Sequence, residues 1–124
     1  MRTVLGVLIA LHGLVHLIGF LVPWRLLVLP EIPYATTAVW GALELGAVGA
    51  RLLGVGWLLG ALVFLLAALG VVSSAPWAVP MTAVAACFSA LLCLAGAPAA
   101  LAGLVLDLLI LLAIVGIPGW LYAR

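Results

Sequence analysis

Charge is nearly absent from this sequence. Only 6% of the 124 residues are charged, and the basic ones are four arginines with no lysine. By contrast, 70% of the residues are hydrophobic, and the mean hydropathy is +1.59. A soluble domain of this size needs far more polar surface. The composition therefore predicts an integral membrane protein, and the net charge of +1 gives no reason to expect nucleic acid as a partner.

Motifs for common enzyme chemistry are also missing. The chain has no Walker motif, dinucleotide fingerprint, GxSxG, HExxH, CxxC or CxxCH. Its two cysteines, Cys87 and Cys93, are six residues apart in one apolar stretch, so a helix would point them to opposite faces. We expect them to be small packing residues, with no disulfide and no metal site. These absences favour a protein that is not an enzyme and leave any cofactor unknown.

Long apolar runs are plentiful and define the expected fold. A spanning helix needs about 20 mostly apolar residues, so the chain has room for four spans in one transmembrane domain. Arg2 precedes the first run, but this run is longer than the core of a signal peptide and lacks a cleavage site, so we interpret it as a retained span. The predicted fold is an all-α, four-transmembrane-helix bundle with spans at residues 4–22, 51–72, 77–95 and 99–117.

The first connection is predicted to be an interfacial loop over residues 23–50. Pro30 and Pro33 should break any helix there, because each lacks an amide donor and restricts the residue before it.

Residues 36–72 are harder to assign because they contain no proline and no polar turn. The stretch is too long for one span and too short for two spans with a turn between them. We predict that residues 37–50 form a short helix or re-entrant segment in the interface. The alternative, a second span at residues 38–56, would bury both Glu44 and Arg51 in lipid.

Small residues mark the expected helix contacts. Gly56 and Gly60 form a GxxxG motif, and Gly6 and Gly13 lie on a small-residue face of the first span. Such residues let helix backbones approach closely in lipid, so we expect these positions to pack against other helices.

Three ionisable groups stand inside predicted spans. His12 and His16 are four residues apart and share a helix face, while Asp107 interrupts an apolar run. Polar groups at membrane depth face a partner or a cavity. The histidines could lock helix packing, relay protons, contact a quinone or lipid headgroup, or bind a metal or haem that finds further ligands elsewhere.

Depth along the helices suggests how these groups meet. Counted from the predicted span ends, His16, Ser89, Asp107 and Trp57 lie at one level, and His12 lies about 6 Å deeper. We therefore predict that His16 and Asp107 point into the bundle within direct or water-bridged reach.

Residues 11–20, LHGLVHLIGF, resemble the first helix of a group of small bacterial four-helix membrane proteins. Residues 33–37, PYATT, and 54–57, GVGW, resemble later parts of that group, and the length and helix number are loosely similar to DoxX-like proteins. The resemblance implies a four-helix bundle in a bacterial membrane.

The function that best fits these observations is a non-catalytic accessory subunit or scaffold of a membrane complex. The alternative is a bundle that binds a quinone or lipid, or conducts protons, through His16 and Asp107. We expect a multi-pass protein of the bacterial inner membrane with cytoplasmic termini. Its expected partners are the lipid bilayer and other membrane subunits or further copies of the chain.

Overall fold

The computed structural model describes residues 1–116, and these form four helices and one short hairpin. The helices are α1 (Arg2–Leu21), α2 (Gly46–Ser73), α3 (Ala78–Ala95) and α4 (Leu101–Gly116). The first three are long and apolar enough to cross a membrane, whereas α4 is a shorter apolar helix of 16 residues. By helix length and hydropathy, the chain is a small polytopic membrane protein built as a helical bundle. The last residue of the predicted fourth span, at position 117, lies outside the described part of the chain.

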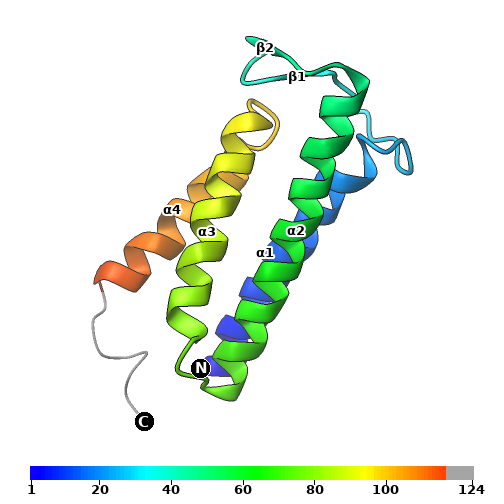
Figure 1. Cartoon of the computed structure of the whole chain (residues 1–124). Helices are drawn as coiled ribbons and strands as arrows, with labels where there is room; N and C mark the ends of the chain where they lie inside the picture. The colour runs from blue at the N-terminus through cyan, green and yellow to red at the C-terminus, as the bar shows by residue number, and fades with distance from the viewer. Residues whose placement is uncertain (117–124) are drawn as a thin grey trace.

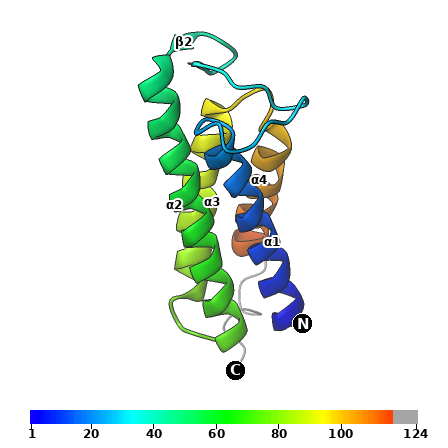
Figure 2. The same ribbon diagram turned by 90° about the vertical axis from the view of Figure 1, so that its right-hand side faces the viewer.

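The helices pack in chain order. Figure 1 shows α1 beside α2 and α3 beside α4, and Figure 2 shows the two pairs joined through α2 and α3. Within residues 1–116, extensive backbone contact joins α1 to α2, α2 to α3 and α3 to α4, but not α1 to α4. The bundle is therefore open, at the level of the backbone, between its first and last helices.

The second helix begins five residues earlier than predicted. It starts at Gly46 and runs for 28 residues to Ser73, so it contains the predicted span at 51–72, whereas the alternative span at 38–56 is wrong because residues 38–45 are not helical. At the helix start, the Gly46 amide donates to the Glu44 carboxylate at 3.2 Å, and Gly46 itself has φ +67°. This carboxylate satisfies one of the amides that a helix N-terminus leaves unpaired.

The segment before α2 is a β-hairpin, which corrects the prediction of a helical or re-entrant piece. Strands β1 (Thr37–Ala38) and β2 (Leu43–Glu44) pair antiparallel. At the tip, the Val39 and Trp40 amides donate to the carbonyls of Ala95 and Ala97 at 2.9 and 3.1 Å. The hairpin therefore closes one end of the bundle by pairing with carbonyls at the end of α3 (Figure 1).

The proline break is where the sequence places it. Leu29 and Ile32 form an isolated bridge around a tight turn, so residues 30–33 are non-helical as predicted. Close by, the Arg25 guanidinium lies 4.5 Å above the Tyr34 ring. This cation–π contact joins the two ends of the loop that contains the prolines.

Glycines on α1 allow its close approach to α2. A Cβ at Gly13 would stand 2.6 Å from the Phe64 Cβ, and one at Gly6 would overlap the Val72 side chain. Only hydrogen fits at these positions without separating the two helices.

The glycines of the GxxxG motif face α3, and Gly60 also faces His16 of α1. At both Gly56 and Gly60 an added Cβ would meet Leu92 of α3, at 3.1 and 3.3 Å, and at Gly60 it would also meet the His16 ring at 3.0 Å. The absence of a side chain at Gly60 therefore leaves room for the imidazole ring of His16.

Candidate functional site

A polar network lies inside the apolar bundle and joins three helices. Its side chains are His12 and His16 from α1, Ser89 from α3 and Asp107 from α4. Ser89 and Asp107 are fully buried, His16 is 2% exposed, and the His12 side chain is 9% exposed. Polar groups at this depth are stable only when they are partnered.

The carboxylate of Asp107 is bound at both oxygens. His12 Nε2 lies 2.8 Å from Oδ1, and the Ser89 hydroxyl donates to Oδ2 at 2.6 Å. The first contact connects α1 to α4, the two helices whose backbones do not pack extensively on one another. Asp107 is the one fully buried residue of α4 and the centre of the network.

His16 completes the network from the other side of Ser89. Its Nε2 lies 2.7 Å from the Ser89 Oγ, and its Nδ1 lies 3.0 Å from the backbone carbonyl of His12. Since a carbonyl can only accept, Nδ1 must carry a proton to make that bond. Both nitrogens of this buried ring are therefore engaged.

The predicted link between His16 and Asp107 takes a different form in the structure. Both side chains are buried inside the bundle, but the Ser89 hydroxyl connects them, rather than a direct contact or a water. The histidine that touches Asp107 directly is His12. The depth count favoured His16 and placed His12 about 6 Å deeper, so it selected the wrong histidine for the direct contact, because the side chain that reaches the carboxylate depends on the rotation and tilt of α4.

Aromatic rings enclose the two imidazoles. Phe64 of α2 is fully buried, with its ring centre 4.8 Å from that of His12 and 5.2 Å from that of His16. The Trp57 ring lies 5.2 Å from His16 and would contact a Cβ at Gly19 of α1. Trp57 therefore borders the network, as its predicted depth suggested, and supplies a ring face rather than a hydrogen bond.

Cys93 is a neighbour of the site that sequence reasoning did not include. Its Sγ lies 3.7 Å from Asp107 Oδ2 and 3.9 Å from Ser89 Oγ, while Cys87 is exposed. The four-residue spacing from Ser89 to Cys93 places both on one helix face and could have indicated this. Within residues 1–116, no cluster of histidine, cysteine or acidic side chains is arranged to hold a metal ion.

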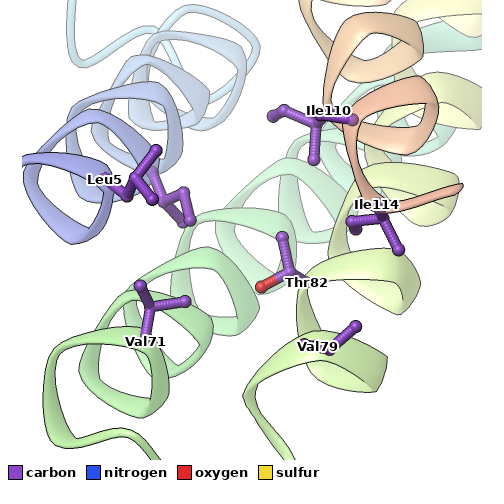
Figure 3. Close-up of a pocket in the computed structure, with 8 residues that line it drawn as sticks. Leu5, Val71, Val79, Thr82, Ile110 and Ile114 are labelled. Carbon is purple, nitrogen blue, oxygen red and sulfur yellow. The ribbon is translucent and has the colours of Figure 1, made fainter. Parts of the chain in front are cut away.

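An apolar cavity of about 100 Å³ lies beside the N-terminal half of α1. Figure 3 shows several of its lining side chains pointing toward one another. It is lined by Leu5, Ile9, Val71, Val79, Thr82, Ile110, Ala113 and Ile114, which come from all four helices. Its one hydroxyl, on Thr82, donates to the Ala78 carbonyl at 2.8 Å. Because the lining offers no free polar partner, the cavity suits hydrocarbon rather than water.

The cavity and the network are neighbours along the helices. Ile9 and Ile110 line the cavity, and each lies three residues from a network residue, His12 and Asp107 respectively. One helical turn therefore separates the polar contact between α1 and α4 from the cavity between the same helices.

Comparisons of this chain with protein-family models, with curated proteins and with solved structures found no match in any of the three.

Proposed function

We propose that this protein is a non-catalytic membrane scaffold, an accessory subunit whose apolar outer surface holds a partner in the bilayer. The observation that carries this proposal is the polar network, whose buried side chains form hydrogen bonds with one another and so join three helices. A site that acted on a water-soluble substrate would need a path to water. The network instead lies within apolar helices and aromatic rings.

The apolar side chains on the outer surface support a role in assembly. Large apolar side chains face outward along all three long helices, including Leu11 on α1, Leu62 on α2 and Leu91 on α3. In a bilayer these surfaces are compatible with both lipid and other helices, so a partner subunit or a second copy of the chain can pack there.

The proposal includes a location. The resemblance of the first helix to small bacterial membrane proteins supports the inner membrane of a bacterium, and the proposed orientation places the termini in the cytoplasm. The arginine distribution gives no independent support for this orientation, because Arg2 lies at one end of the bundle and Arg25 and Arg51 lie at the other.

A second candidate function rests on the cavity. Its apolar lining, which comes from all four helices, favours a hydrocarbon chain, such as the tail of a lipid or a quinone. A volume of about 100 Å³ is smaller than the engineered cavity of about 150 Å³ that holds benzene, so only the end of a chain would fit.

One experiment separates the two candidates. The full chain is purified from its source membrane in lipid nanodiscs after cross-linking, and proteins, lipids and quinones are quantified by mass spectrometry. The scaffold proposal predicts a membrane protein at constant stoichiometry, cross-linked to outward positions such as 62 on α2. A constant amount of one lipid or quinone without a stoichiometric protein would contradict the scaffold proposal and favour the cavity.

A further inference from the structure

The hydrogen bonds around Ser89 restrict where protons can be. The serine hydroxyl has one proton, yet it lies between Asp107 Oδ2 at 2.6 Å and His16 Nε2 at 2.7 Å. Whichever partner accepts that proton, the other partner must donate to the serine oxygen for both bonds to form. Since His16 Nδ1 is already committed as a donor to the His12 carbonyl, only two arrangements satisfy every bond.

In the first arrangement the network contains an ion pair. Ser89 donates to the Asp107 carboxylate, and His16 donates to Ser89 from Nε2 while keeping its proton on Nδ1, so its ring is an imidazolium. In the second arrangement the network is neutral. A protonated Asp107 carboxyl donates to Ser89, and Ser89 donates to the bare Nε2 of His16.

These two arrangements differ only in the positions of two protons. We propose that Asp107, Ser89 and His16 form a proton relay in the interior of the bundle, an activity that does not depend on the scaffold role. In one transfer the Asp107 O–H bond and the Ser89 O–H bond break, and a new Ser89 O–H bond and the His16 Nε2–H bond form. The heavy atoms keep their places, because each proton moves along a hydrogen bond that already exists.

His12 is the most exposed member of the network, so a proton that enters the relay reaches this ring first. His12 is partly exposed whereas His16 is buried, and the Nδ1 of His12 has no hydrogen-bond partner within residues 1–116. A proton taken up at Nδ1 lets His12 pass its Nε2 proton to Asp107 Oδ1. The proton on Oδ2 then moves to Ser89, and the Ser89 proton moves to His16. The net result transfers one proton from His12 to His16, which lies one helical turn, or about 6 Å, along α1.

The surroundings of the network fit a transfer of this kind. The ionisable groups that face it from the described helices are His12 and His16 on α1, Cys93 on α3 and Asp107 on α4, while α2 presents the rings of Trp57 and Phe64. Within residues 1–116, Asp107 is the one acidic side chain paired with a histidine, and it belongs to the relay itself. The position of the relay protons therefore decides where positive charge resides in this part of the membrane.

Nitrogen-15 NMR of histidine-labelled protein in lipid nanodiscs tests the relay, because each ring nitrogen reports whether it carries a proton. In the wild type we expect the His16 Nε2 signal to move toward that of a protonated nitrogen as the pH falls from neutral to mildly acidic. In Ser89→Ala we expect the same nitrogen to stay unprotonated over that range, with the charge confined to His12. Spectra of His16→Gln assign the two rings.

Two further variants guard against loss of structure. Asp107→Asn keeps a polar partner for His12 and Ser89 but cannot release a carboxyl proton, so it should also leave His16 neutral. Ser73→Ala removes a hydroxyl that bonds only to the backbone of its own helix, away from the network and the cavity, and it should behave like the wild type. A wild-type His16 that stays neutral at every pH, or a His16 response that survives both Ser89→Ala and Asp107→Asn, would overturn the proposal.

Discussion

The pairing of α1 with α2 and the pairing of α1 with α4 show two different ways to hold helices together in lipid. Toward α2, α1 presents Gly6 and Gly13, and the two backbones meet closely along their length. Toward α4 it presents His12, whose bond to Asp107 joins helices that otherwise lie apart around an apolar cavity. The first interface depends on the absence of side chains, whereas the second depends on one polar contact.

This difference assigns distinct roles to the two interfaces. Close packing at glycines distributes van der Waals contacts over many residues, so the change of any one contact alters the interface little. A polar contact beside a cavity concentrates the interaction in a few atoms, and these can be rearranged by moving protons. We therefore expect α1 and α2 to form the stable core and α4 to be the helix that responds to its surroundings.

The largest effect should come from filling the glycine interface. Gly13→Leu would place a side chain where even a Cβ stands 2.6 Å from Phe64 and 3.3 Å from the Ala61 carbonyl. We expect a loss of about 3 kcal/mol or more of stability, since the helix backbones must separate. Thermal unfolding in detergent, followed by size-exclusion chromatography, measures this. Val15→Leu, at an outward position on the same helix, should leave the unfolding temperature unchanged.

An intermediate effect should come from removing the carboxylate of Asp107. Asp107→Leu leaves His12 and Ser89 without their shared acceptor, so we expect it to cost about 2 kcal/mol. Asp107→Asn keeps a polar partner for the histidine and should cost about half as much. The same unfolding assay decides the matter, and equal losses from the two variants would argue that the Asp107 bonds do not stabilise the bundle.

The smallest effect should come from filling the cavity. Ala113→Val adds two methyl groups at an exposed position of α4 that lines the cavity, and we expect it to stabilise the bundle by about 0.5 kcal/mol. Ala102→Val makes the same change at an exposed position of α4 that does not line the cavity, and it should have no effect. A fall in stability for Ala113→Val alone would indicate that the cavity has an occupant or cannot accept the added groups.

Sequence reasoning reached the membrane class and the helical bundle, because length and hydropathy determine them with little help from tertiary context. It missed the hairpin before α2 for a physical reason. The tip residues Val39 and Trp40 have φ of +52° and +55°, a region that β-branched and bulky residues avoid. Their amides are held by the end of α3, a long-range contact that no local turn pattern announces.

The sequence allowed us to predict which side chains form the polar network, but not all of the hydrogen bonds between them. Four polar residues stand out within apolar stretches of the sequence: His12, His16, Ser89 and Asp107. Residue counts along the predicted helices place them within about one helical turn of each other in depth. The counts could not show that Ser89 bridges His16 to Asp107, or that Cys93 lies beside them. Those contacts depend on how each helix is rotated about its axis, which packing against neighbouring helices decides.

The central claim is that the contact between His12 and Asp107 holds α4 to α1, and a double-mutant cycle tests it most directly. Unfolding free energies are measured in the same detergent for His12→Ala, Asp107→Ala and the double variant. A parallel cycle pairs His12→Ala with Thr82→Ala, because Thr82 bonds only to its own helix. We predict a coupling of about 1 kcal/mol or more between His12 and Asp107, near the upper part of the range seen for hydrogen bonds in membrane proteins, and none between His12 and Thr82. Additive losses from His12→Ala and Asp107→Ala would contradict the account.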